Sequence, residues 1–200
     1  MRIASLCGSS GPGSSNKVAL TIAAEWIGRS GVAEPMTTVA LDGIPPFHPE
    51  LVDDPPPPVA EMRLLVEGAD GVMIAAPEYA GGLAGSTKNA LDWFVGSASI
   101  YHRPIAVLSA GTSGGVFAIE QLVRTLTWQG ALVVATLGIS APRTKTNADG
   151  RFVDPSTIEA IQQWASALVD ATAQRPRELL EIVDGIVGPF GIDVGRFGDL

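Results

Sequence analysis

Apolar residues in this chain occur in two patterns that alternate along its length. Short runs bounded by turn-forming residues predict five β-strands, at Arg2–Cys7, Thr37–Leu41, Gly71–Ala76, Pro104–Ala110 and Ala131–Leu137. Between them, apolar residues recur every three or four positions, which predicts helices at about Asn16–Arg29, Val59–Gly68, Ser86–Phe94, Val116–Gln129 and from Pro155 onwards. Ser14 or Ser15 is expected to cap the first helix and Asp154 the last one.

This alternation predicts an α/β domain whose parallel sheet is covered by helices on both faces. Five-stranded chains of this kind commonly adopt the doubly wound order 2-1-3-4-5, and their ligands bind beyond the carboxyl ends of the strands. The segments after strands one, three and four are rich in Gly, Ser and Pro, and are therefore the candidate binding loops. We expect one domain over residues 1–174, with residues 175–200 forming a short helix and an arm packed on the domain or on a second subunit.

Composition narrows the range of partners. The formal charge is −8 and the sequence pI is about 4.7, which disfavours binding to nucleic acid or to an anionic membrane. No stretch approaches the ~18 apolar residues of a membrane span, and the first apolar run is too short for a signal peptide. Cys7 is the single cysteine, and no His/Asp/Glu cluster has metal-ligand spacing. We expect a cytoplasmic protein without a metal site.

The first candidate loop, residues 8–16, lies between a strand and a helix start, where backbone N–H groups and hydroxyls can hold a phosphate. Three related motifs each fail at one residue. Ser14 stands where a P-loop has lysine, Asn16 replaces the third glycine of a dinucleotide fingerprint, and Gly13 stands where a phosphatase based on Cys7 needs arginine. Because the loop has no basic residue, it suits a phosphate monoester held by neutral donors. The alternative is an exposed turn.

The second loop, residues 77–93, has the sequence PEYAGGLAGSTKNALDW. Its small residues let the backbone approach a flat ligand closely, and Tyr79 offers a ring for stacking and a hydroxyl. The alternative is a strand exit followed by a capped helix, with Trp93 in the core.

The third loop, residues 109–115, contains the pattern G-x-S-x-G around Ser113 after a strand and before a helix. This pattern is typical of α/β-hydrolases, in which the catalytic histidine follows the nucleophile. Both histidines, His48 and His102, precede Ser113, so the hydrolase interpretation fails on chain order.

Together the loops resemble those of the NAD(P)H-dependent FMN reductase family, which includes bacterial quinone, chromate and azo-dye reductases. The family's first loop, G-S-x-R-x-x-S-x-N, is matched at Gly8, Ser9, Ser14 and Asn16, with Gly11 in place of arginine. Its second loop, P-E-Y-N-x-x-x-P-G-x-x-K-N-A-x-D-W, is matched at Pro77, Glu78, Tyr79, Gly85, Lys88, Asn89, Ala90, Asp92 and Trp93, whereas Ala80 and Ala84 replace Asn and Pro. The resemblance covers about residues 1–170.

The resemblance implies a flavodoxin-like fold, bound FMN, and hydride transfer from NADPH or NADH to the flavin and on to a flavin, quinone, azo compound or metal oxyanion. It implies no catalytic side chain, and a homodimer or homotetramer. The residues expected to face the phosphate are Ser9, Ser14, Ser15 and Asn16. Those expected beside the ring and ribityl chain are Pro77, Glu78, Tyr79 and Ala80. The glycine-rich turn expected beside the ring contributes Ser109, Gly111, Gly114 and Gly115.

Two departures from the family pattern affect the expected site. Without the loop arginine a charge-assisted hydrogen bond to phosphate is absent, so we expect weaker FMN binding than in a Gly11→Arg variant. Ala80 removes a side-chain contact to the flavin. Two alternatives therefore stay open: a flavodoxin-like electron carrier, and a non-catalytic binding domain with a degenerate flavin site.

Overall fold

Five parallel strands form the central sheet of the computed structural model, which describes residues 1–11, 13–31 and 36–198. They are β1 (Ile3–Cys7), β2 (Thr37–Ala40), β3 (Gly71–Ala75), β6 (Pro104–Gly111) and β7 (Leu132–Ser140). Their order in space is β2-β1-β3-β6-β7. Counted in chain order this is 2-1-3-4-5, so the predicted flavodoxin-like topology is confirmed. β7 runs three residues further than predicted.

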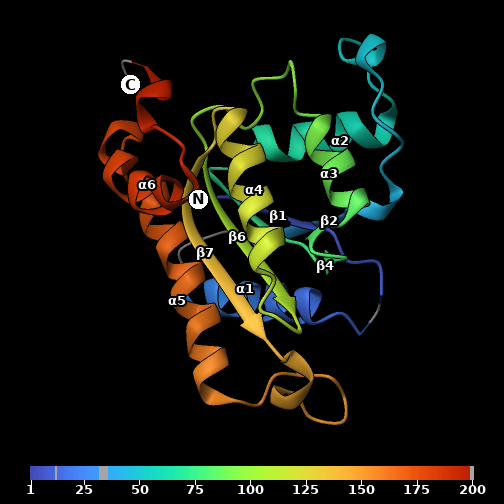
Figure 1. The fold of residues 1–200 in the computed structure, drawn as a ribbon, viewed down its shortest axis with the longest axis vertical. Helices are drawn as coiled ribbons and strands as arrows, with labels where there is room; N and C mark the ends of the chain where they lie inside the picture. The colour runs from blue at the N-terminus through green and yellow to red at the C-terminus, as the bar shows by residue number, and fades with distance from the viewer. Residues whose placement is uncertain (12, 32–35, 199–200) are drawn as a thin grey trace.

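Helices cover both faces of the sheet (Figure 1). α1 (Ser15–Ser30) and α5 (Pro155–Thr172) pack against each other and against the same central strands. α4 (Val116–Trp128) packs on β6 and β7, and beside it stand α3 (Gly85–Asp92) and then α2 (Pro57–Glu67). α2 is joined to α3 by Arg63, whose guanidinium donates to the carbonyl oxygen of Trp93. The sheet is therefore buried on both sides, which explains its unbroken apolar runs.

A small hairpin after β3 was not predicted. β4 (Glu78–Tyr79) and β5 (Gly82–Leu83) pair in antiparallel fashion ahead of α3. The two turn residues, Ala80 and Gly81, have φ values of 51° and 71°. Positive φ at both central positions is what a two-residue hairpin turn requires, and alanine adopts it at an energetic cost. Short 3₁₀ helices cover Leu41–Gly43, Pro49–Leu51, Pro142–Lys145, Pro176–Leu179, Gly188–Phe190 and Val194–Phe197.

Helices α1 and α5 begin close to the predicted positions, but only the predicted cap of α5 makes a capping hydrogen bond. The Asp154 carboxylate accepts a hydrogen bond of 2.9 Å from the backbone N–H of Thr157 and caps α5. Hydrogen bonds from Thr157 and then Ser156 lower the pKa of Asp154 to about 2. Ser14 occupies the N-cap position of α1, yet its hydroxyl makes no capping hydrogen bond. That hydroxyl is thus not used by the helix itself.

The tail packs on the domain. α6 (Leu180–Val187) lies against β7 and buries Val183 and Val187, and further along the tail Ile192 is also buried. This covers the edge of the sheet at β7, where unpaired backbone groups would otherwise be exposed. The domain boundary at residue 174 stays a prediction. None of the helices in the described parts of the chain is both long and apolar enough to cross a membrane.

Candidate functional site

A cleft of about 760 Å³ lies at the carboxyl ends of the strands, the end marked by the arrowhead of β7 in Figure 1. This volume is typical of small-molecule sites. Four segments line the cleft, one after each of β1, β3, β6 and β7. Their lining residues are Ser9, Gly11, Gly13, Ser14, Ser15, Asn16, Pro77, Glu78, Tyr79, Ala110, Gly111, Thr112, Ala141, Pro142, Arg143 and Thr144.

Most residues predicted for the site border this cleft. They are Ser9, Ser14, Ser15, Asn16, Pro77, Glu78, Tyr79 and Gly111. Four others do not line it: Ala80, Ser109, Gly114 and Gly115. Ala80 lies at the hairpin turn, and Ser109 is fully buried within β6. Gly114 and Gly115 face Ser140 and Ser109 respectively, so their role is to let backbone segments approach closely.

The end of the cleft where we predicted phosphate binding consists of the first loop and the start of α1. Ser14 and Ser15 stand at the N-terminus of this 16-residue helix, whose first turn has no acidic residue. No described atom lies within 4 Å of the position that a Cβ at Gly11 or Gly13 would take, so the loop presents open backbone. Free N–H groups, hydroxyls and the positive end of the helix dipole can together bind a phosphate monoester.

Asn16 holds this loop in shape. Its side chain is only 2% exposed. The amide nitrogen donates to Ser9 Oγ at 3.1 Å, and the amide oxygen accepts from the backbone N–H of Ala110 at 2.8 Å. Because the backbone N–H of Ala110 is a donor, the oxygen end of the Asn16 amide must face β6. The amide expected to face the phosphate thus ties the loop to the end of β6.

Glu78 also has a structural partner that the sequence did not reveal. Its carboxylate accepts hydrogen bonds from the backbone N–H groups of Phe117 at 2.9 Å and Ala118 at 3.3 Å, and from Ser113 Oγ at 2.9 Å. Glu78 therefore caps α4 from the hairpin, and the helix N-terminus compensates its negative charge. Tyr79, next to it, is 65% exposed and borders the mouth of the cleft.

The segment after β7 was missed in the sequence analysis. The backbone N–H of Ala141 donates to the carbonyl oxygen of Gly111 at 3.1 Å, which joins this segment to the end of β6. It carries Arg143, the one cationic side chain among the described residues lining the cleft. One signal could have revealed it: the last strand of a parallel sheet ends at the same rim as its neighbours, so the basic residues that follow it belong to that rim.

The nucleophiles near the cleft are not activated. Burial raises the pKa of the Cys7 thiol, which donates a hydrogen bond to the carbonyl oxygen of Ser9 at 3.7 Å. Ser113 bonds to Glu78, and neither His48 nor His102 lines the cleft. These positions support neither the phosphatase nor the hydrolase motif. Among the described residues, no group of three or more His, Cys, Asp or Glu side chains could hold a metal ion.

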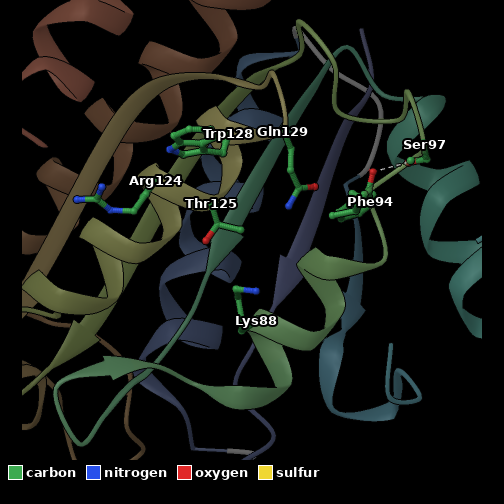
Figure 2. Close-up of a pocket in the computed structure, with 9 residues that line it drawn as sticks. Lys88, Phe94, Ser97, Arg124, Thr125, Trp128 and Gln129 are labelled. Carbon is green, nitrogen blue, oxygen red and sulfur yellow. Dashed lines mark hydrogen bonds between the residues drawn. The ribbon is translucent and has the colours of Figure 1, made fainter. Parts of the chain in front are cut away.

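A second cavity of about 500 Å³ lies between α3 and α4 (Figure 2). It is bordered by Lys88 of α3 and by Arg124 and Trp128 of α4. Both cations are paired, Lys88 with Asp92 at 2.6 Å and Arg124 with Glu120 at 3.4 Å. Because this cavity shares no lining residue with the first cleft, it is a separate surface feature.

Comparison with known proteins agrees with this geometry. A Pseudomonas aeruginosa NAD(P)H-dependent FMN reductase is 31% identical over 181 residues, which are 84% of this chain and 93% of that protein. A Bacillus sp. NADPH azoreductase is 31% identical over 90 residues, 44% of this chain and 50% of that protein. The Paracoccus denitrificans FerB, a flavoenzyme NAD(P)H:(acceptor) oxidoreductase, superposes with a TM-score of 0.70 at 26% identity, covering 86% of this chain and 97% of that chain. Residues 1–145 match the NADPH-dependent FMN reductase family, and the chain belongs to this family of enzymes, which use FMN with NAD(P)H as electron donor.

Proposed function

We propose that this enzyme binds FMN in the cleft and passes electrons from NADPH or NADH to a small acceptor, such as a flavin, quinone, azo compound or metal oxyanion. The observation that carries the proposal is the cleft itself, in which the N-terminus of α1, a hairpin and a glycine-containing strand end meet. Bound FMN supplies the redox chemistry, and the protein supplies position and polarity. The cytoplasmic location expected from the sequence stays a prediction.

Two groups of residues would hold the cofactor. Ser9, Ser14 and Ser15 would donate to the phosphate, together with the first N–H groups of α1. The isoalloxazine ring would lie between the hairpin residues 77–79 and the backbone at residues 110–112, which border the same cleft. The Glu78 carboxylate is bonded to α4, so it is not poised there as an acid or base. Chemistry at the site therefore depends on placing the flavin and the nicotinamide face to face.

The test is a visible spectrum of the purified protein after loading with FMN and removal of excess cofactor. We expect a retained flavin band that bleaches on anaerobic addition of NADPH, and NADPH oxidation that accelerates when quinone is supplied. A mixture of FMN and NADPH without protein is the control. A flavodoxin-like carrier would retain FMN but oxidise NADPH slowly, and a degenerate site would retain no flavin, so either outcome would refute the proposal. Comparing kcat/KM among the four acceptor classes then identifies the preferred one.

We further propose that α4 joins two copies of the chain. Its outward face carries Phe117 and Trp128, which are 52% and 66% exposed, with Gln121 and Arg124 between them. In a two-fold antiparallel pair of these helices, Phe117 meets the partner's Trp128, and Gln121 meets the partner's Arg124. The face is thus self-complementary, as a two-fold interface requires. Arg124 and Trp128 stand on this helix beside the cavity in Figure 2.

Sedimentation at micromolar concentration tests this interface. We expect the wild-type protein to be dimeric or tetrameric and the Trp128→Glu variant to dissociate, because it places two carboxylates in an apolar contact. Leu64→Glu on α2 is the matched control, since Leu64 is also 66% exposed. Its assembly should not change. A monomeric wild-type protein, or equal effects of the two substitutions, would rule out α4 as the interface.

A further inference from the structure

The first loop of the proposed FMN site carries no positive charge. A phosphate monoester carries a charge of about −1.5 to −2 at neutral pH. Residues 8–16 include no basic residue that could meet this charge. Hydroxyls, N–H groups and a helix dipole stabilise the anion, but a guanidinium adds shorter and roughly twofold stronger hydrogen bonds.

Arg143 is placed to make up for this absence. It borders the cleft together with Gly11, Gly13 and Ser14, although more than 125 residues separate it from them in sequence. Its guanidinium is exposed and makes no hydrogen bond or ion pair with the described residues. Glu78, the other charged residue of the cleft wall, is held by the N-terminus of α4. No described residue therefore neutralises the Arg143 charge.

The fold brings Arg143 to the first loop through a short series of backbone contacts. Asn16 joins the loop to Ala110 at the end of β6, and β6 pairs with β7 up to Gly111 and Ser140. Ala141 then bonds back to Gly111 and turns the chain into the 3₁₀ helix that carries Arg143.

The segment beyond that helix runs along α1. Arg151 and Phe152 line a third cavity together with Val18 and Ile22 of α1. Both ends of the Arg143 turn are thus fixed beside the elements that form the phosphate end of the cleft.

We infer that Arg143 binds the phosphate of FMN and supplies, from the other side of the cleft, the positive charge that the first loop lacks. This inference rests on the proposed function. A guanidinium suits the task because it can donate two parallel hydrogen bonds to one phosphate. The 2′-phosphate of NADPH is the other phosphate monoester that could enter the cleft, and the experiment below separates the two.

The test measures dissociation constants of FMN and of riboflavin, which lacks the phosphate, by flavin fluorescence. We expect Arg143→Ala to weaken FMN binding by about tenfold to a hundredfold, the range for a hydrogen bond to a charged group, and to leave riboflavin binding unchanged. Arg151→Ala is the matched control, because it removes a nearby arginine that lines a different cavity. It should change neither constant.

A second substitution tests whether the two positions supply the same charge. Gly11 has space for a side chain and no positive φ, so an arginine fits there. Gly11→Arg should recover most of the lost FMN affinity in the Arg143→Ala background and add little to the wild-type protein, which is a non-additive cycle. This replaces the gain in the wild-type background that the sequence alone led us to expect, because Arg143 already supplies the charge. Equal gains in both backgrounds would show that Arg143 does not contact the phosphate.

The remaining outcomes are also decisive. Unchanged FMN binding in Arg143→Ala, or equal losses for FMN and riboflavin, would overturn the inference. If Arg143→Ala left FMN binding unchanged but raised the KM for NADPH and not that for NADH, the guanidinium would bind the 2′-phosphate of NADPH. That result would also overturn the inference. If the wild-type protein binds neither flavin, the proposed function fails as well. If FMN binding does not depend on Arg143 but riboflavin still binds to every variant, only the inference about Arg143 fails.

Discussion

Replacing Gly115 by alanine is expected to destabilise the protein by about 3–5 kcal/mol. This figure adds the cost of overpacking to the cost of holding alanine in a left-handed backbone conformation. Gly115 has a φ of +69° and precedes α4. A Cβ at this position would lie 2.1 Å from Ser109 Oγ and 2.2 Å from Ser109 Cβ, both inside β6. The start of α4 would have to move away from the sheet, which would weaken the hydrogen bonds between its N–H groups and Glu78. Urea unfolding measures the loss.

Two variants separate crowding from backbone strain. Gly114→Ala shares the positive φ, +84°, but the nearest atom to its Cβ is 3.7 Å away, so we expect a loss of only about 1 kcal/mol. Ser109→Gly should restore part of the stability of Gly115→Ala, because it removes both crowding atoms. The Ser109 hydroxyl is buried without a hydrogen-bond partner in the described structure, so its removal breaks no hydrogen bond. Equal losses for the two glycines, or no recovery in the double variant, would contradict the steric explanation.

The sheet could be predicted from the sequence because its signals are local. Residues 2–7 and 71–76 are apolar runs bounded by turn residues, and both form buried central strands. The hairpin at residues 78–83 could not be predicted, because two-residue strands carry no periodicity and Ala80 gives no sign of a left-handed turn. The prediction ended β7 at Leu137, where Gly138 interrupts the apolar run, and in the structure the strand is no longer continuously buried beyond Ala135. That error also hid Arg143.

The candidate loops were predicted more accurately than the roles of their side chains. Motif residues pointed to the rim that borders the cleft, and Asn16 and Glu78 were interpreted as ligand contacts. In the structure each satisfies backbone N–H groups that the fold leaves unpaired, at the end of β6 and at the start of α4. Sequence cannot show which N–H groups lack partners, because that depends on the register between distant elements. A polar motif residue therefore either contacts the ligand or holds the loop that does so.

Asn16 makes this distinction measurable. Asn16→Asp is expected to weaken FMN binding by about a hundredfold or more. The carboxylate can still accept from Ala110 N–H, but it cannot donate to Ser9 and it adds a negative charge at the loop. Repulsion between two unit charges in contact at the loop reaches a few kcal/mol at an effective dielectric constant near 20, and about 1.4 kcal/mol corresponds to a tenfold change in affinity.

Riboflavin and a neutral variant complete this test. Because riboflavin has no phosphate, Asn16→Asp should weaken its binding far less than that of FMN. Asn16→Ala removes both hydrogen bonds without adding charge and leaves the Ala110 N–H unpaired in a buried position, so we expect a loss of about 2 kcal/mol in stability and similar losses for both flavins. If Asn16→Asp bound FMN as tightly as the wild-type protein, the phosphate could not lie at the start of α1. The flavin would then have to enter the cleft in another orientation, with its phosphate away from the one helix N-terminus that borders the first loop.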